Sequence, residues 1–187
     1  MLIVGISGSP RQNKNCDQII DHALKFFENK DFNTKAINLS QQRVNPCLHC
    51  DACKKQKSCP QKDETNQINK NIERADAILV ASPVYFGSIT GQLKSLFDRT
   101  LPLRRNGFTL KSKIGAAFTI GGSRNGGQEL AIQNIQSWML IHGMIIVGDN
   151  NHFGGTLQNP WLEDKFGQET ISGTLNSVLD LLTKIKA

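Results

Sequence analysis

Four cysteines lie within a stretch of thirteen residues, in the pattern C-x2-C-x2-C-x5-C: Cys47, Cys50, Cys53 and Cys59. Three thiols at successive intervals of three can surround three corners of an iron–sulfur cubane, while the fourth returns from slightly further along the chain. A tetrahedral zinc site more often uses two separated C-x2-C pairs that approach the metal from opposite sides. The spacing therefore favours a [4Fe–4S] cluster, with zinc as the alternative.

The cellular compartment decides how these thiols are interpreted. The chain begins with the apolar run Met1–Ser7 and shows no basic region, long apolar stretch or cleavage site of a signal peptide, so we expect a cytoplasmic protein. Disulfides are uncommon in that reducing environment, which argues against pairing of the cysteines with one another. Four cysteines make His49, which lies between two of them, unnecessary as a ligand. The fifth cysteine, Cys16, falls on the apolar stripe of a helix and is expected to be buried, and a contact with a cofactor at that helix start stays open.

A second candidate site follows the first apolar run. The segment Ser7-Gly-Ser-Pro-Arg-Gln-Asn-Lys-Asn15 combines hydroxyls, cations and amides with the start of a helix, and it contains no Asp or Glu. Backbone amides and the helix dipole favour a phosphate group at such a place. The segment matches neither G-x-G-x-x-G nor G-x-x-x-x-G-K-[ST], so the main evidence for a dinucleotide or a nucleoside triphosphate is missing. A terminal monophosphate, as in FMN, fits a hydroxyl-rich loop better.

Two further loops follow later apolar runs. Ser82-Pro-Val-Tyr-Phe-Gly-Ser88 offers apolar and aromatic surface for the flat side of an isoalloxazine ring. Gly121-Gly-Ser-Arg-Asn-Gly-Gly127 is rich in glycine, so its backbone can approach the polar edge of that ring and donate hydrogen bonds to it. In an open α/β sheet, ligands bind outside the carboxyl ends of the strands, where the strand order reverses. The three loops therefore predict one flavin site at a single edge of a sheet.

Short apolar runs bounded by turn residues alternate along the chain with segments whose apolar residues recur every three or four positions. The short runs predict buried strands at 2–6, 34–39, 77–81, 113–119 and 144–148. The periodic segments predict helices over 16–27, 64–74, 89–97, 132–139 and 171–185. This alternation predicts a single α/β domain over residues 1–187, with a parallel sheet and helices on both faces. The stretch 44–62 follows the second strand, holds the four cysteines and has no periodicity of its own.

Composition and charge limit the possible partners. Hydrophobic residues make up 39% of the chain, and no run approaches the ~18–20 apolar residues of a membrane span. Lys and Arg number 22 against 16 Asp and Glu, a formal charge of +6. The positive residues are scattered and aromatic residues are only 6%, so no platform for nucleic-acid bases is indicated. We therefore expect neither a membrane nor a nucleic acid as a partner.

The three loops, together with the motif Leu93-Lys-x-x-x-Asp98-Arg99, resemble those of the flavodoxin-like NAD(P)H-dependent FMN reductases. The cysteine run is similar to that of the iron–sulfur flavoproteins of methanogenic archaea and other anaerobes, a branch of the same superfamily. The resemblance covers residues 1 to about 149. It implies a flavodoxin-like, doubly wound sheet of five parallel strands in the order 2-1-3-4-5, binding one FMN and one [4Fe–4S] cluster. It also implies a homodimer or homotetramer in which the cluster of one subunit lies near the flavin of another.

The resemblance also implies the residues of the flavin site. Those of the first loop, around the phosphate and ribityl chain, would be Ser7, Ser9, Pro10, Arg11, Asn13, Asn15 and Cys16. Those of the second loop, along the ring, would be Ser82, Pro83, Val84, Tyr85, Phe86 and Gly87. Those at the polar edge of the ring would be Gly121, Gly122, Ser123 and Gly127. Cys16 departs from the family pattern, which often has Thr at this position.

A cubane cluster passes single electrons, whereas FMN holds one or two. We therefore expect an electron-transfer oxidoreductase in which a ferredoxin-like donor reduces the cluster, the cluster reduces FMN, and FMN reduces a small acceptor such as a quinone, dioxygen or peroxide. Lys54, Lys55 and Lys57 favour an acidic donor of the ferredoxin type. One alternative is an NAD(P)H-dependent FMN or quinone reductase with a structural zinc in the cysteine loop. An alternative of another class is a redox-sensing module that binds nucleic acid.

No pair of residues indicates acid–base catalysis, so no catalytic residue is assigned. His142 is expected to be a core or helix-terminal histidine. Asp149 and His152 are expected to have a structural role in a loop. Asp98 and Arg99, near a helix end, are expected to form a surface pair worth at most ~1 kcal/mol.

Overall fold

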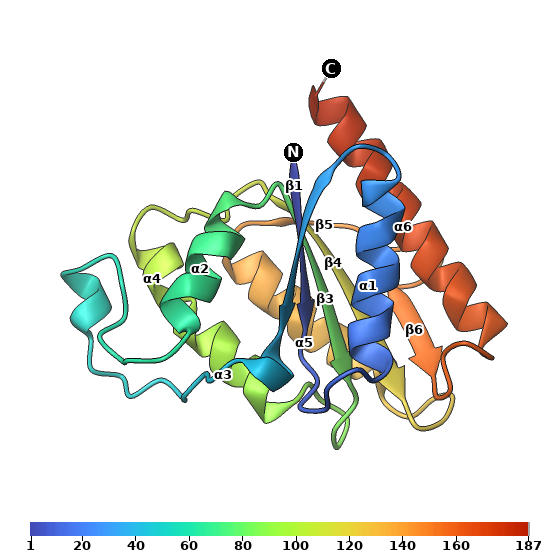
Figure 1. The fold of residues 1–187 in the computed structure, drawn as a ribbon, viewed down its shortest axis with the longest axis horizontal. Helices are drawn as coiled ribbons and strands as arrows, with labels where there is room; N and C mark the ends of the chain where they lie inside the picture. Colours follow the sequence, from blue (N-terminus) through green and yellow to red (C-terminus); the bar gives the residue numbers. More distant parts are fainter. Residues whose placement is uncertain (187) are drawn as a thin grey trace.

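A parallel sheet forms the centre of the fold in this computed structural model, which describes residues 1–186 (Figure 1). Its strands are β1 (Leu2–Ser7), β2 (Asn33–Asn38), β3 (Ala77–Pro83), β4 (Ile114–Gly121), β5 (Ile145–Ile146) and β6 (Gly155–Gln158). The order is β2-β1-β3-β4-β5, which confirms the predicted flavodoxin-like arrangement. Every residue of β3 and β4 is buried, because helices cover both faces of these strands.

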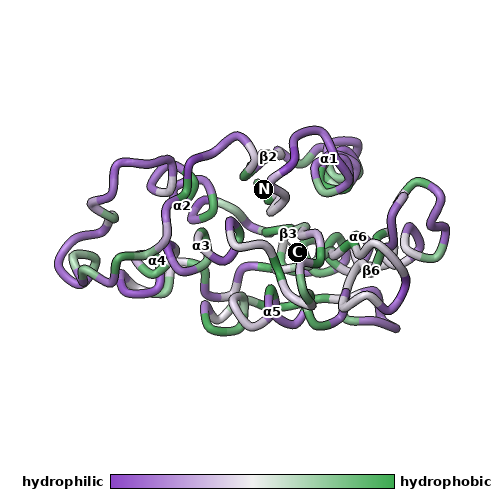
Figure 2. Tube along the Cα trace, turned by 90° about the horizontal axis from the view of Figure 1, so that it is seen from below, coloured by the Kyte–Doolittle hydropathy of each residue, from purple (hydrophilic) through white to green (hydrophobic). Residues whose placement is uncertain are grey.

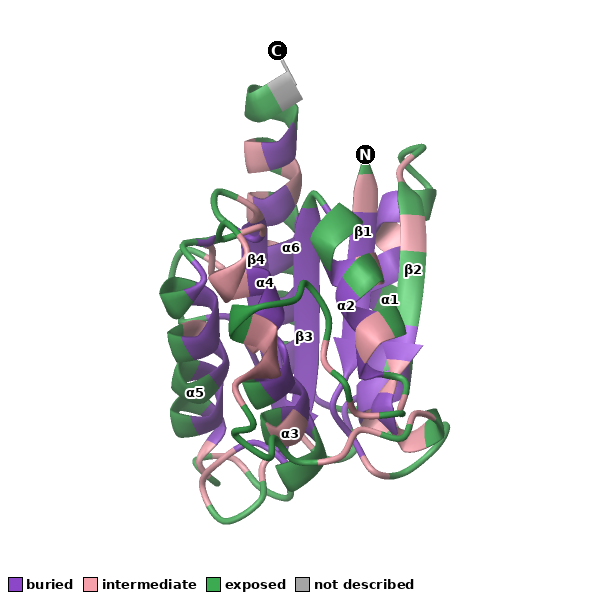
Figure 3. Ribbon diagram, turned by 90° about the vertical axis from the view of Figure 1, so that its left-hand side faces the viewer, coloured by how far each residue is buried: buried purple, intermediate pink, exposed green. Residues whose placement is uncertain are grey.

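Within residues 1–186, six α-helices pack on the two faces of the sheet. They are α1 (Asn15–Glu28), α2 (Thr65–Arg74), α3 (Gly91–Arg99), α4 (Leu101–Arg105), α5 (Gln128–Ile141) and α6 (Lys165–Lys186). α1 and α6 share one core with the sheet, and α2, α3, α4 and α5 share the other. In Figure 3 the second group lies in front of the buried strands β3 and β4. α4 was not predicted, because five residues are too few to show a helical period.

Alternating residues of each strand enter opposite cores, as the period of a strand requires. On β3, Ile78 and Val80 pack in the core with α2 and α3, whereas Leu79 packs in the core with α1 and α6. The predicted apolar stripe of α1 is buried along its whole length. On α6, Ile185 is 55% exposed although it fits the stripe, because this end of the helix extends beyond the sheet (Figure 3).

The predicted fifth strand over 144–148 is wrong in extent, because the structure divides that position between two strands. β5 is two residues long and pairs with the start of β4, and β6 pairs in parallel with the end of β4, from Phe118 to Gly121. Between them the chain leaves the sheet in a polar loop, in which the Asp149 carboxylate accepts from the backbone amide and ring of His152. The chain returns at Gly154, where a Cβ would lie 2.4 Å from a backbone oxygen of β4.

The cysteine-rich stretch forms a long excursion between β2 and α2. It contains the short 3-10 helix η2 (Ala52–Lys54) and lies at one end of the molecule, beside α2 and α4 (Figure 1). Most of it is hydrophilic (Figure 2), so apolar burial contributes little to its position. Within residues 1–186, no helix is long and apolar enough to cross a membrane.

Candidate functional site

The loop after β1 is held between two neighbouring elements. The Gly8 amide donates to the Ala81 carbonyl of β3 at 2.7 Å, and the Gly8 carbonyl accepts from Thr90 Oγ1 at 2.6 Å. Ser9 Oγ accepts from the Arg11 amide at 3.1 Å, which turns the loop toward α1. The first hydrogen bond of α1 runs from the Gln18 amide to Lys14, so the amides of its first turn have no partner within the helix. This is the arrangement that favours an anion.

A cleft of about 260 Å³ lies where the loops after β1, β3 and β4 meet. The residues that line it are Ser9, Arg11, Lys14, Asn15, Cys16, Pro83, Val84, Tyr85, Ile120, Gly121, Gly122 and Asn159. The structure therefore brings together nine of the residues named from the sequence for the flavin site. Lys14, Ile120 and Asn159 were missed, although Lys14 lies within the loop that was singled out.

The other residues named for the flavin site lie behind the cleft or beside it. Ser7 and Ser82 are fully buried, and Ser7 Oγ has no hydrogen-bond partner. Gly87 and Gly127 pack their loops together, because a Cβ on Gly127 would lie 3.0 Å from the Gly87 Cα. The Phe86 side chain is fully exposed at the tip of its loop, on a backbone with φ of 50°. The remaining three residues, Pro10, Asn13 and Ser123, also do not line the cleft.

Asn159 reaches the cleft from a distant part of the chain. It lies just after β6, and its Oδ1 accepts from Asn15 Nδ2 at 2.7 Å. Two residues further on, Trp161 Nε1 donates to Gln18 Oε1 at 2.9 Å, which ties the same loop to α1. No sequence signal could have found Asn159, because the strand that delivers it was not predicted.

The cysteine loop is closed by a buried ion pair between α3 and the segment before α2. Arg99 Nη1 and Nη2 lie 2.8 and 2.9 Å from the two carboxylate oxygens of Asp63, and both side chains are at most 1% exposed. Arg99 also donates to the Asn45 carbonyl at 2.8 Å, and the Asn45 amide donates to Asp63. Since Asn45 precedes the first of the four cysteines and Asp63 follows the last, the pair joins both ends of the loop.

The expected surface pair of Asp98 and Arg99 is therefore wrong. Asp98 is exposed and pairs with Lys94 one turn earlier on α3, whereas Arg99 points inward. Successive residues on a helix point about 100° apart, so one can face water while the next is buried. The sequence around Asp98 and Arg99 does not show which of the two is buried, because the partner of Arg99, Asp63, lies 36 residues earlier.

All four cysteines line one small cavity of about 30 Å³. Side chains of α3 and α4, among them Arg99, Pro102 and Arg105, complete its wall. The five cysteines are free, and Cys16 is buried elsewhere, on α1. In the part of the chain that the structure describes, no three His, Cys, Asp or Glu side chains converge as a site for a single metal ion. The donor set of four thiols on one cavity fits a thiolate-bound metal group.

Several hydrogen bonds position the individual cysteines. Asn66 on α2 binds the backbone of Cys59 with both side-chain atoms, at 2.9 and 2.8 Å. The His49 amide donates to Cys47 Sγ at 3.4 Å, so this residue contributes its backbone to the loop. Arg105 Nη1 donates to Cys53 Sγ at 2.9 Å. These contacts come from residues that sequence reasoning did not select for this site.

The ionisation of the charged groups around the loop follows from their contacts. Burial alone would raise the pKa of Asp63, but the hydrogen bonds from Arg99 and from backbone amides lower it to about 2. Burial alone would lower the pKa of Arg99, but its contacts with Asp63 and the nearby Cys59 side chain raise it above its ordinary value. Burial of Cys16 holds the pKa of its thiol far above the ordinary value, so Cys16 stays protonated.

Comparison with known proteins agrees with this geometry. Residues 1–156 match the family model of the NADPH-dependent FMN reductases. The chain is 50% identical over 186 residues to an iron–sulfur flavoprotein of Methanosarcina thermophila, covering 100% of this chain and 97% of that one. It is 42% identical over 193 residues to an iron–sulfur flavoprotein of Methanocaldococcus jannaschii, covering both chains completely. The structure of an archaeal flavodoxin matches with a TM-score of 0.63 at 18% identity, over 96% of this chain and 98% of that one.

The sheet order and the cleft at the carboxyl ends of β1, β3 and β4 define a flavodoxin-like protein, and the family match makes it a flavin-dependent oxidoreductase. The chain belongs to the NADPH-dependent FMN reductase family, in its branch of iron–sulfur flavoproteins. The resemblance inferred from the loops and the cysteine run is thereby confirmed.

The buried ion pair gives a first prediction. Asp63→Asn leaves the Arg99 guanidinium buried without a counter-charge, so we expect it to lower the free energy of unfolding by about 3 kcal/mol. Asp98→Asn, on the exposed neighbour of Arg99, should change it by less than about 0.5 kcal/mol. Urea unfolding at pH 7 measures both. Equal urea midpoints for Asp63→Asn and the wild type would contradict a stabilising role of the Arg99–Asp63 ion pair.

The pH dependence of unfolding tests the same pair. The pKa of Asp63 is lowered from 3.8 to about 2 in the folded chain. The contribution of the ionised Asp63 carboxylate to the free energy of unfolding is therefore complete above pH 4. As the pH falls toward 2 this contribution is lost, which lowers the free energy of unfolding by about 2 kcal/mol. Asp63→Asn should lack this part of the acid sensitivity, so the stabilities of the two proteins should converge between pH 4 and pH 2.

Proposed function

We propose that the chain is an electron-transfer flavoprotein that binds FMN in the cleft and a [4Fe–4S] cluster in the cysteine loop. It would take electrons from an acidic, ferredoxin-like donor and deliver them to a small acceptor such as a quinone, dioxygen or peroxide. The observation that carries the proposal is that four thiols line one cavity beside two arginines. The same chain has a cleft at the carboxyl ends of β1, β3 and β4 and belongs to a family of FMN reductases. When bound, a cluster supplies one-electron transfer, and FMN supplies one- or two-electron transfer.

The cleft offers each part of FMN a suitable surface. Arg11 and Lys14 supply positive charge at the start of α1, where unpaired amides and the helix dipole also favour the phosphate. Pro83, Val84 and Tyr85 present an apolar wall for one face of the ring. The exposed backbone at Gly122 supplies donors and acceptors for the polar edge. Among residues 1–186, no Asp or Glu side chain lines the cleft.

The arrangement of the thiols around the cysteine cavity favours a cluster over zinc. Either group held by four thiolates carries net negative charge, which the guanidinium groups of Arg99 and Arg105 can offset. Each thiolate of a cubane binds a different iron, so the four thiols surround a cavity, whereas zinc ligands converge on one point. The relatives named iron–sulfur flavoproteins, which the chain matches along its whole length, agree with this choice. Five free cysteines are consistent with the reducing cytoplasm as the compartment.

A homodimer or homotetramer is part of the proposal. Of the residues that the structure describes, none lines both the cleft and the cysteine cavity. In one chain the cleft lies at the carboxyl ends of the strands, whereas the cysteine loop lies at one end of the molecule beside α2 and α4 (Figure 1). A second copy that brings its cleft against this loop would give electrons a shorter path than the single chain offers.

The content of bound cofactors is the first test. After anaerobic purification we expect a flavin spectrum over a broad sulfur-to-iron charge-transfer band, with about four iron and four sulfide per chain. Stoichiometric zinc, no sulfide and rapid bleaching of the flavin by NADPH would instead support a hydride-accepting FMN or quinone reductase. Tight DNA binding that is salt-sensitive and lost on oxidation would support the nucleic-acid module.

The phosphate end of the cleft is tested by neutral variants. Arg11→Gln and Lys14→Gln should each weaken FMN binding about tenfold, or about 1.4 kcal/mol, because each removes a positive charge near the phosphate. Lys25→Gln, on the exposed face at the far end of α1, is the matched control and should bind FMN like the wild type. Quenching of FMN fluorescence on titration with apoprotein gives the dissociation constants. Equal affinity for FMN in all of these proteins would contradict the assignment of the phosphate to the loop after β1.

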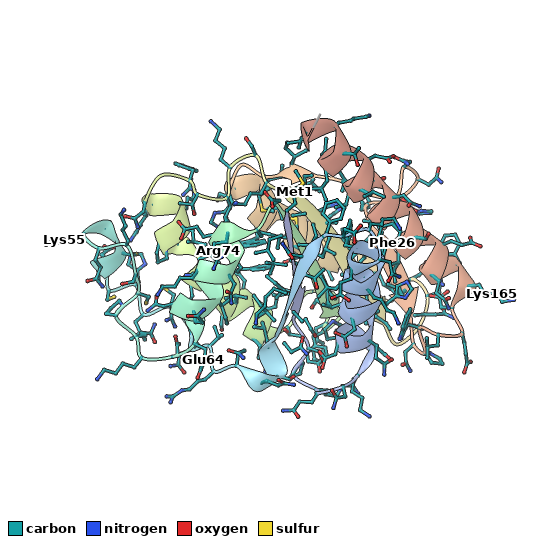
Figure 4. All side chains as sticks on the ribbon, turned by 45° about the horizontal axis from the view of Figure 1, so that its top comes forward. Met1, Phe26, Lys55, Glu64, Arg74 and Lys165 are labelled. Carbon is teal, nitrogen blue, oxygen red and sulfur yellow. The ribbon has the colours of Figure 1, made fainter. Side chains whose placement is uncertain are left out.

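The donor assignment is tested by charge reversal at the cysteine loop. Lys55 and Lys57 are exposed, and Lys55 lies at the outer tip of the loop, on the opposite side of the molecule from Lys165 (Figure 4). The double variant Lys55→Glu/Lys57→Glu should slow reduction by an acidic ferredoxin about tenfold at low ionic strength. Lys25→Glu/Lys165→Glu carries the same change of net charge and should stay within about twofold of the wild type. If the stopped-flow rate of reduction changes neither with the charge reversal nor with the salt concentration, electrostatic attraction of the donor to this loop is contradicted.

A further inference from the structure

Helix α4 carries an arginine to the cysteine cavity. Pro102 and Leu103 are buried and fix the helix against the core. Arg105, its last residue, turns toward the loop, where Nη1 donates to Cys53 Sγ at 2.9 Å and lies 3.0 Å from Asp51 Oδ1. The contact is directed at a sulfur atom, one of the four that the proposed function assigns as ligands.

The loop itself holds this guanidinium in place. Asp51 has φ of 58°, a left-handed backbone that turns the chain into η2 and brings its carboxylate beside Cys53. The other carboxylate oxygen, Oδ2, accepts from Lys54 Nζ at 2.8 Å. Asp51 is therefore shared between two cations, and its fixed position keeps Arg105 against Cys53.

The preceding residue provides an internal comparison. Arg104 has the same charge and lies on the same helix, but its Nε donates to the Ile141 carbonyl at 3.2 Å, and its guanidinium lies 5.3 Å from the Phe108 ring. Arg104 does not line the cysteine cavity, whereas Arg105 does. The two arginines therefore separate a general effect of positive charge from a contact made at sulfur.

We propose that Arg105 is a positioning residue that raises the reduction potential of the cluster through its hydrogen bond to Cys53. The inference rests on the proposed function, since it requires the cluster in the cysteine loop. One-electron reduction adds negative charge that is shared by the irons and the thiolate sulfurs. A cationic N–H donor at one sulfur stabilises the reduced form more than the oxidised form, so it favours uptake of the electron.

The experiment compares the reduction potentials of four proteins that have been loaded with iron and sulfide under anaerobic conditions. In Arg105→Met the donor and the charge are lost while the aliphatic stem remains, and the equilibrium constant for one-electron reduction should fall roughly tenfold, a shift of about 59 mV to lower potential. Arg105→Lys keeps the charge without the planar fork and should shift less, in the same direction. Arg104→Met should match the wild type. Spectroelectrochemical titration with soluble mediators gives the four potentials.

The outcomes separate this inference from the proposed function. A wild-type chain that holds no iron or sulfide contradicts the proposed function, and the inference fails with it. A loaded wild type with unchanged potentials in both Arg105 variants overturns the inference alone. An equal shift in Arg104→Met also overturns it, because the effect would then come from net charge. If Arg105→Met loses its cluster, Arg105→Lys decides: a shift to lower potential supports the hydrogen bond, and no shift overturns it.

Discussion

The ion pair between Arg99 and Asp63 is the contact on which the cysteine loop depends. The loop is polar and largely exposed, so apolar burial cannot fix its shape. Burying two charges costs free energy, which bidentate geometry and further hydrogen bonds to Asn45 and Thr65 offset. Since the pair joins the segments on either side of the four cysteines, it closes this polar loop beside α3 and α4.

Helix α3 connects this ion pair to the cleft at the carboxyl ends of β1, β3 and β4. At its N-terminus, Thr90 caps the helix by accepting from the Leu93 amide, and its hydroxyl donates to Gly8 in the loop after β1. At its C-terminus, Arg99 holds the cysteine loop. Leu93 and Leu96 are fully buried between these ends and fix the helix on the sheet. One helix of nine residues therefore positions both candidate sites. The two sites are lined by different residues.

The candidate sites were predictable to different degrees. Most residues that line the cleft were named from the sequence, because the carboxyl ends of parallel strands meet at one edge and the loops that follow β1, β3 and β4 are recognisable by composition. The four cysteines were selected from their spacing alone, and the structure places them on one cavity. Arg99, Arg105 and Asn66 were missed for the cysteine site, because each acts across many residues and has no local pattern. Asn159 was missed because a short polar loop divides the last strand position, and no apolar run marks β6.

The amino-acid sequence determined the class of fold, the order in which strands and helices alternate, and the residue types at each candidate site. These are encoded locally, in the period of apolar residues, the turn residues and the spacing of thiols. The tertiary structure decided which polar side chains are buried and what they contact. Arg99 and Asp98 are adjacent in the chain, yet one is enclosed with a carboxylate 36 residues away and the other is in water. The reason is physical: the burial of a charge depends on partners that only the folded chain brings together.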